Sequence, residues 1–158
     1  MELDQELRPA LERAVKILEE ESLPCVFLRG GEIVQRGAGT GVAPLIAALE
    51  EDSEIIRGTV LVDRIIGKAA AMLAVLGGVS GVYGMTMSAA ARDYLAQREI
   101  PASCGTLTER IINRAGTGLC PMEQAVLELE DPASALPTLK ATLARLRAGG
   151  PGGAPGTR

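Results

Sequence analysis

The run Cys120-Pro121-Met122-Glu123 combines a thiol and a carboxylate at the spacing of a helix start. Cys120 falls at the capping position and Glu123 at the third helical position, from where a carboxylate can accept the backbone N–H of the cap. A thiol at a helix N-terminus faces unpaired N–H groups, which favour the nucleophilic thiolate. The chain has no histidine to act as a base, and Glu123 opposes thiolate formation. A structural cap and a reactive or ligand-contacting thiol therefore both stay open.

Lys68 is a second candidate, because it is one of only three lysines and stands in the apolar run IIGKAAAMLAV. An isolated charge among apolar side chains is costly, so the ammonium must be paired, hydrated or neutralised. Asp63, five residues earlier at the expected end of a central strand, is the nearest plausible partner. A structural ion pair and a cleft lysine that contacts an anion such as phosphate both stay open.

Two glycine-containing stretches could approach a ligand closely. Residues 37–41 (GAGTG) could wrap a phosphate with backbone N–H groups, but they match neither the P-loop nor the dinucleotide fingerprint, and a flexible connector is the simpler interpretation. Arg114 could clamp a phosphate or carboxylate, or lie in a solvated loop. The predicted ligand-binding residues are Thr40, Gly41, Asp63, Gly67, Lys68, Arg114, Cys120 and Glu123, and the catalytic candidates are Cys120, Lys68 and Glu123.

The composition limits the chemistry further. The chain has 158 residues and no histidine, and its three cysteines follow no metal-ligand spacing, so we expect neither a metal nor a cofactor. A net charge of −4 and an aromatic content of 2% argue against a nucleic-acid partner. No apolar run reaches the roughly 18 residues of a membrane span, and the charged N-terminus lacks the order of a signal peptide. We therefore expect a soluble, cytoplasmic protein with free thiols.

The hydrophobic pattern predicts the elements that must position these residues. Apolar residues recur every three or four positions through residues 4–22, which indicates an amphipathic helix. Short β-branched or apolar stretches bounded by glycine indicate strands, and Gly30-Gly31 indicates a tight hairpin turn. The predicted strands are 25–29, 32–36, 59–63, 79–84 and 102–106, and the predicted helices are 4–22, 41–52, 65–76 and 88–98, followed by a helical C-terminal third.

This order predicts an α/β fold. A helix between two strands implies a right-handed parallel crossover, so the natural packing is a three-layer α/β/α sandwich around a mixed five-stranded sheet. Thr40 could cap the helix at 41–52, and Asp131 could cap the helix that begins at Pro132. Residues 1–148 are expected to form one domain, and the glycine- and proline-rich residues 149–158 a disordered tail.

Two segments carry a resemblance to a known family. Residues 62–79 (VDRIIGKAAAMLAVLGGV) and 111–132 (IINRAGTGLCPMEQAVLELEDP) resemble an uncharacterised prokaryotic domain-of-unknown-function family that is assigned to the cytidine deaminase-like fold. The resemblance covers about residues 4–147 and is specific in those two segments. It implies the fold and brings no settled activity with it.

The resemblance also shows which motifs are missing. Zinc deaminases place H-x-E or C-x-E at the helix after strand two and P-C-x-x-C at the helix after strand three. Here the corresponding segments, 39–43 (GTGVA) and 63–68 (DRIIGK), contain no histidine, cysteine or glutamate. Hydrolytic deamination by the usual zinc mechanism is therefore excluded.

Three functional hypotheses follow. The first is a zinc-free deaminase-like domain that binds a nucleotide or nucleotide-like small molecule at the vestigial active-site cleft. The second is an enzyme of unknown substrate that uses the thiol of Cys120 or the amine of Lys68. The third is a self-associating interaction module, in which the helix at 65–76, apolar on every side and hence covered on every side, lies against a second copy in a homodimer.

Overall fold

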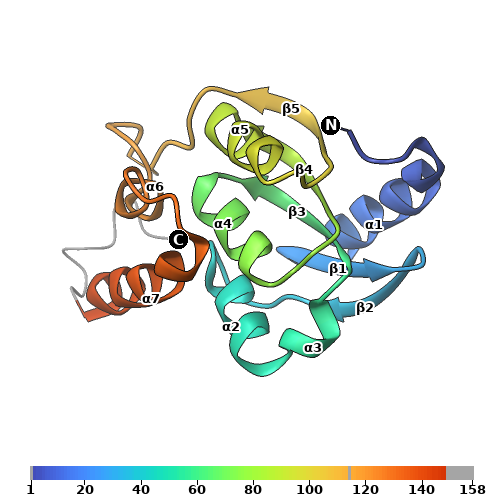
Figure 1. Cartoon of the computed structure of the whole chain (residues 1–158), viewed down its shortest axis with the longest axis horizontal. Coiled ribbons are helices and arrows are strands. Elements are labelled where there is room, and N and C mark those ends of the chain that lie inside the picture. The colour runs from blue at the N-terminus through green and yellow to red at the C-terminus, as the bar shows by residue number, and fades with distance from the viewer. Residues whose placement is uncertain (1, 114, 149–158) are drawn as a thin grey trace.

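The computed structural model describes residues 2–113 and 115–148 and contains one five-stranded sheet with helices on both sides (Figure 1). The strands are β1 (Cys25–Arg29), β2 (Glu32–Arg36), β3 (Val60–Ile66), β4 (Gly81–Ser88) and β5 (Ala102–Thr108). The helices are a 3-10 turn at Gln5–Leu7, α1 (Arg8–Glu20), α2 (Ala43–Glu51), α3 (Ser53–Ile56), α4 (Lys68–Leu76), α5 (Ala89–Gln97), α6 (Pro121–Ala125) and α7 (Pro132–Ala148).

The sheet is mixed, as predicted. Its strand order is β2-β1-β3-β4-β5. β1 pairs antiparallel with both β2 and β3, whereas β3, β4 and β5 are parallel and are joined by the crossover helices α4 and α5. The α/β class, the mixed five-stranded sheet and the helices on both of its faces are therefore confirmed.

The hairpin between β1 and β2 is also confirmed. Its two turn residues, Gly30 and Gly31, have φ angles of 59° and 84°. A two-residue turn that matches the twist of its strands needs positive φ at both positions, and glycine adopts that conformation without a steric penalty.

The two faces of the sheet are covered unequally. On one face α1 stands alone, and its Ala10, Ala14 and Leu18 pack on Val26 and the neighbouring buried residues of β1 and β3. The other face carries the larger core, to which α2, α4, α5, α6 and α7 contribute (Figure 1). The candidate site is formed by residues at the edge of this larger core.

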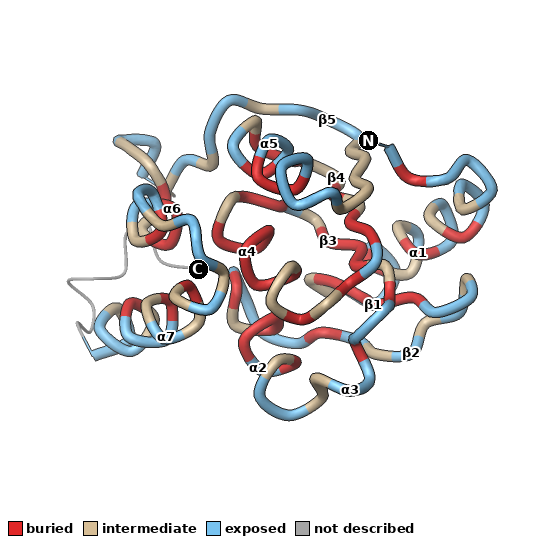
Figure 2. The backbone as a smooth tube through the Cα atoms, viewed as in Figure 1, coloured by how far each residue is buried: buried red, intermediate tan, exposed pale blue. Residues whose placement is uncertain are grey.

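The central helix α4 is buried along nearly its whole length, as Figure 2 shows. Residues 69–74 are all buried within the chain, against the sheet on one side and against α2, α5 and α7 on the others. The prediction that an all-apolar helix must be covered on every side is confirmed. Because that cover comes from the same chain, α4 offers no free face to a second copy.

The strands run further toward their carboxyl ends than the sequence pattern predicts. Residues 65 and 66 were expected in a helix, but Ile65 and Ile66 pair with Thr86 and Met87 and continue the parallel ladder of β3 and β4. Gly67 then caps α4, which begins at Lys68. Pairing with a strand that is distant in sequence overrides the local pattern here. For the same reason β4 extends to Ser88 and β5 to Thr108.

The helix starts differ in their agreement with the predictions. Asp131 caps α7, since its Oδ1 accepts the N–H of Ala133 at 3.0 Å. The predicted cap of α2 by Thr40 is wrong: the cap residue is Val42, and no side chain bonds to the helix end. The predicted disordered tail, 149–158, lies outside the described residues. Across residues 2–113 and 115–148, the helices are too short or too polar for any of them to traverse a lipid bilayer.

The buried position of α4 gives a stability prediction. Leu73 is 1% exposed, so Leu73→Ala leaves a cavity and should lower the free energy of unfolding by about 2–5 kcal/mol. Leu127, which is 58% exposed, is the matched control, and Leu127→Ala should change it by less than about 1 kcal/mol. Urea denaturation of both variants measures the difference, and equal losses would contradict the described core.

Candidate functional site

A recess of about 460 Å³ lies where the loop after β2, the end of β3 and the segment before α6 meet. It adjoins the N-terminal ends of α2 and α4, because Val42 and Gly67, the cap residues of those helices, are part of its wall. Ligands of α/β proteins commonly bind at such an edge, beyond the carboxyl ends of parallel strands. The polar lining is Ser22, Thr40, Asp63, Arg64, Asn113, Cys120 and Glu123, and the apolar wall includes Leu23, Pro24, Ile65, Ile111, Ile112 and Met122.

Asp63 is the central carboxyl group of this recess. It is 7% exposed, and its Oδ1 accepts the N–H of Ile65 at 3.2 Å. Burial raises the pKa of Asp63 to about 7, although backbone N–H groups and the charge of Arg64 act in the opposite direction. Among the described residues no cationic side chain bonds to it. Asp63 is therefore a buried acceptor, close to half-ionised at neutral pH, that faces a cavity.

The neighbouring Arg64 is engaged elsewhere. Its guanidinium donates to the carbonyl oxygens of Leu18 and Leu23 at 2.6 and 2.7 Å. These carbonyls belong to the C-terminal end of α1 and the loop that follows it, where a positive charge stabilises the negative end of the helix dipole. The charge of Arg64 thus holds α1 against the sheet instead of serving the recess.

Glu123 closes the N-terminus of α4. Its Oε1 accepts the N–H of Lys68 at 2.8 Å and its Oε2 the N–H of Ala69 at 3.0 Å. The sequence predicted a bond from Glu123 to the cap of its own helix; that prediction is wrong, because the carboxylate satisfies two N–H groups of a different helix. Burial raises the pKa of Glu123, while the same two N–H groups and Lys68 lower it.

Gly67 makes this approach possible. A Cβ built on Gly67 would lie 2.5 Å from Oε2 of Glu123, so any side chain there would collide with the carboxylate. The backbone of Gly67 is extended, with φ −100° and ψ −177°, a conformation that other residues adopt freely. Position 67 therefore requires glycine because Glu123 occupies the space of a side chain, and not because of the backbone conformation.

Lys68 points away from the recess. Its Nζ donates to the carbonyl oxygen of Leu127 at 3.1 Å and to Glu130 at 3.3 Å. The prediction that Asp63 pairs with this lysine is wrong: the ammonium group lies against the segment after α6. Its backbone N–H reaches Glu123, but its ammonium group contributes nothing to the recess.

The structure brings together six of the eight predicted ligand-binding residues. Lys68 is outside the wall, and Arg114 lies outside the described residues. Those that line the recess are Thr40, Gly41, Asp63, Gly67, Cys120 and Glu123.

Cys120 precedes a very short helix, α6, and is 8% exposed. Its side chain forms no capping bond, so the cap that the sequence predicted is wrong in that respect. Its backbone N–H donates to the carbonyl of Ile111 at 2.9 Å, which fixes the segment as part of the wall.

Sequence reasoning missed the apolar wall and Cys25. Cys25 pairs with Asp63 across β1 and β3, and burial, followed by the charge of Asp63, raises the pKa of its thiol. Only the register of β1 on β3 places the two residues side by side, so no local pattern could have indicated it. Ile111 and Ile112 lay within the segment that carries the family resemblance, and their apolar type was the available signal.

The recess is acidic and partly apolar. Two carboxyl groups, a thiol, two hydroxyls and an amide line it, and the one cation among the described lining residues, Arg64, is engaged by backbone carbonyls. Such a surface accepts N–H donors and packs against flat apolar groups, but it opposes an anion. Within residues 2–113 and 115–148, no group of three or more histidine, cysteine, aspartate or glutamate side chains is placed to hold a metal ion.

Comparison with known proteins supplies a family. The family model described as TM1506, a domain of unknown function (DUF1893), matches residues 13–143. Among solved structures, the chain is similar to the crystal structure of a DUF1893 family protein (TM1506) from Thermotoga maritima, with a TM-score of 0.75 and 20% sequence identity over 88% of this chain and 91% of that one. At that identity the likeness bears on the fold alone. No curated protein matches the chain.

The contact between Gly67 and Glu123 predicts a coupled pair of substitutions. Glu123→Ala leaves two N–H groups of α4 without an acceptor and should cost about 1–2 kcal/mol of unfolding free energy. Gly67→Ala displaces the same carboxylate and should cost a similar amount. In the Glu123→Ala background, however, Gly67→Ala should cost clearly less than it does in the wild type, because the carboxylate that it would displace is already gone. Denaturant titration of the four proteins measures this coupling, and additive losses would contradict it.

The raised pKa of Asp63 predicts a pH-dependent stability. Burial disfavours the ionised form of Asp63 in the folded chain. The stability that the protonated carboxyl group contributes is therefore fully present below about pH 4 and is lost as pH rises toward 7. Asp63→Asn keeps the acceptor for Ile65 but cannot ionise. Between pH 4 and 8, the unfolding free energy of Asp63→Asn should therefore rise relative to that of the wild type by up to about 4 kcal/mol. The exposed Glu128→Gln serves as control, and a difference that stays constant with pH would refute the assignment.

Proposed function

This chain belongs to the DUF1893 family, and we propose that it is a small-molecule-binding domain that holds a nucleoside-like ligand in the recess beside Asp63. The observation that carries the proposal is the carboxyl of Asp63, which is 7% exposed, faces a cavity of 460 Å³ and bonds to no cationic side chain among the described residues. A buried acceptor without a cationic partner is costly in a closed core, but it serves a ligand that donates hydrogen bonds.

The shape and lining of the recess support a flat heterocycle. Its volume lies in the range of pockets that hold small ligands, about 300–1,000 Å³. Ile65, Ile111 and Met122 offer apolar contact to the faces of a ring, while Asp63 offers a hydrogen-bond acceptor at its rim. Nucleobases present amino and ring N–H donors at their edges and apolar faces on both sides, which suits both features.

The charge of the recess favours a nucleoside over a nucleotide. The N-terminus of α4, where a phosphate would ordinarily bind, already holds the carboxylate of Glu123. Lys68 and Arg64 direct their charges toward other groups. A phosphate would therefore meet carboxylates and no available cation among the described residues.

We infer that the scaffold itself is cytidine deaminase-like, with its metal corner remodelled. The strand order and the crossovers α4 and α5 are compatible with that fold. Of the two positions where deaminases carry zinc motifs, one is the glycine-rich lead into α2 and the other the start of α4. Glu123 reaches the second position from a different helix, so a carboxylate of the chain takes the place of a metal site.

Catalysis is a weaker alternative. A thiol-dependent enzyme would use Cys120, but Glu123, the nearest candidate base in sequence, has both oxygens engaged by N–H groups of α4. A lysine-dependent enzyme would need Lys68 in the recess, and its ammonium lies with Glu130 instead.

Calorimetry with nucleobases, nucleosides and the corresponding 5′-monophosphates tests the proposal. At least one nucleoside should bind saturably, and its monophosphate should bind more weakly. Asp63→Asn should weaken the nucleoside by about 10-fold or more, the effect of losing a charged acceptor, whereas Glu128→Gln should leave it unchanged. Absence of saturable binding across the series, or equal binding by Asp63→Asn, would overturn the proposal.

A further inference from the structure

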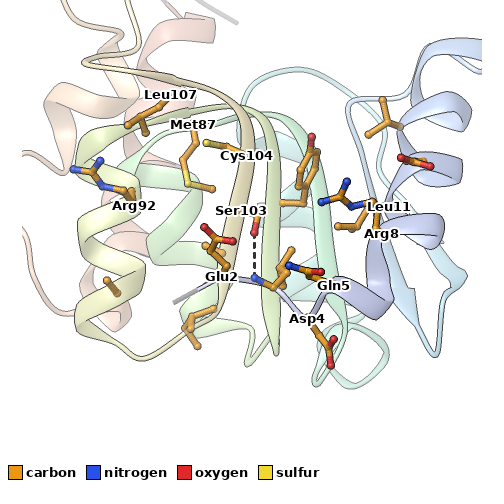
Figure 3. Close-up of a pocket in the computed structure, with 17 residues that line it drawn as sticks. Glu2, Asp4, Gln5, Arg8, Leu11, Met87, Arg92, Ser103, Cys104 and Leu107 are labelled. Carbon is orange, nitrogen blue, oxygen red and sulfur yellow. Dashed lines mark hydrogen bonds between the residues drawn. The ribbon is translucent and has the colours of Figure 1, made fainter.

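The strand β5 forms one edge of the sheet, and its residues 105–107 are exposed. Figure 3 looks onto it, with α5 on one side and α1 on the other. A groove of about 810 Å³ lies beside the strand and is lined by residues of α1, β4, α5, β5 and the N-terminal segment. The N-terminal segment crosses only the start of the strand, where the N–H of Leu3 donates to Oγ of Ser103 at 3.1 Å.

The backbone of β5 has a complete set of outward-facing groups. Val82 pairs in parallel register with Ala102, and the N–H of Val82 donates to the carbonyl of Pro101 at 3.0 Å. Backbone groups alternate in direction along a strand, so the odd-numbered residues of β5 face β4. The N–H and C=O groups of residues 102, 104, 106 and 108 therefore face away from the sheet.

Nothing in the sequence of β5 discourages pairing. Edge strands are ordinarily protected by charged residues, by proline or by a covering element. Residues 102–108 (ASCGTLT) contain neither a charge nor a proline, and Leu107 is 46% exposed. The edge is thus an available template for another strand.

We propose that β5 pairs antiparallel with β5 of a second copy of this chain, so that two sheets join into one across a two-fold axis. Full overlap of the seven-residue strand places its midpoint, Gly105, on the axis. Cys104 then lies opposite Thr106 of the partner subunit, and both carry outward-facing backbone groups. This surface is separate from the recess, so the inference does not depend on the proposed function.

The helix beside β5 fits the same arrangement. Since α5 packs on β4 and β5, two copies of α5 would lie about two strand spacings apart, roughly 10 Å, which is an ordinary helix-packing distance. The side of α5 that lines the groove carries Ala96, which permits a close approach, and Arg92, whose side chain lies 3.0 Å from that of the exposed Asp93. A two-fold axis sets this pair against an identical pair in reversed order.

That charge pattern favours a second copy over an unrelated extended peptide as the occupant. Across a two-fold axis the guanidinium of one copy meets the carboxylate of the other, and the reverse. Each charge therefore has an opposite charge nearby, and the net charge at the contact is zero. An unrelated peptide would use the strand edge, but it would leave the outward side of α5 without a matching surface.

Cross-linking tests the register. In an antiparallel hydrogen-bonded pair the Cα atoms lie about 5.5 Å apart, within the range of a disulfide. Thr106→Cys should therefore form a covalent dimer with the native Cys104 of the partner subunit under mild oxidation. Thr106 is exposed and its N–H faces away from β4, so the fold should tolerate the change. Cys25 and Cys120 are buried and should not compete.

The matched control removes one half of the bridge. In the variant that combines Cys104→Ala with Thr106→Cys, the two introduced thiols are diagonal neighbours about 7–8 Å apart, too far for a disulfide. This variant should remain non-covalent, and peptide mapping of the cross-linked dimer should find the bond at positions 104 and 106. A cross-link that survives Cys104→Ala, or one that maps elsewhere, overturns the proposal.

The non-covalent dimer gives an independent measurement. Light scattering should give twice the mass of one chain. Arg92→Asp places four acidic groups around the axis and should weaken association by at least about 10-fold, and adding Asp93→Arg should restore it. Arg92 and Asp93 are both exposed, so neither change should unfold the chain. A chain that stays monomeric at high concentration, including one that binds an extended peptide at this edge, overturns the proposal.

Discussion

The hydrogen bonds of Glu123 to the N-terminus of α4 join the two halves of the chain. They link residues 55 and 54 positions apart and satisfy two N–H groups that lie in the interior, where a helix end without partners would be costly. Glycine is the only residue type that leaves room for the carboxylate at position 67. The C-terminal segment, with Cys120, Met122 and the helix α7, is thereby fixed against α4, and the wall of the recess depends on it.

The same bonds set the charge of the recess. The positive end of α4, which in many α/β proteins receives an anionic ligand, is neutralised by a carboxylate of the chain itself. Lys68 pairs with Glu130, and Arg64 stabilises the end of α1. Asp63 is left as the acceptor that faces the cavity. The arrangement of charges is therefore the reverse of a phosphate site, and it is the basis for a ligand that donates hydrogen bonds.

The sequence predicted those features that depend on local pattern or on topology. Gly30-Gly31 identified the hairpin, and the alternation of helices and strands identified the mixed sheet. Because the carboxyl ends of parallel strands gather at one edge, residues as distant as Thr40, Asp63 and Cys120 could be expected together. The partners of individual charges could not be predicted. Glu123 and Lys68 had plausible partners nearby in sequence, but packing gave each of them a distant one. The continuation of β3 through Ile66 likewise depends on a ladder that no local window contains.

Arg64 links the C-terminal end of α1 to the wall of the recess, so the motion of that helix end is tied to the recess. The guanidinium holds the carbonyls of Leu18 and Leu23, and Leu23 and Pro24 also form part of the recess wall. The apolar cluster beneath α1 is smaller than the core on the other face of the sheet, so the last turn of α1 depends in part on the bonds of Arg64. Any molecule that restrains Leu23 from the cavity side would hold that turn closed as well. Amide exchange at the end of α1 would then slow when the recess is filled, although no atom of the ligand touches the helix.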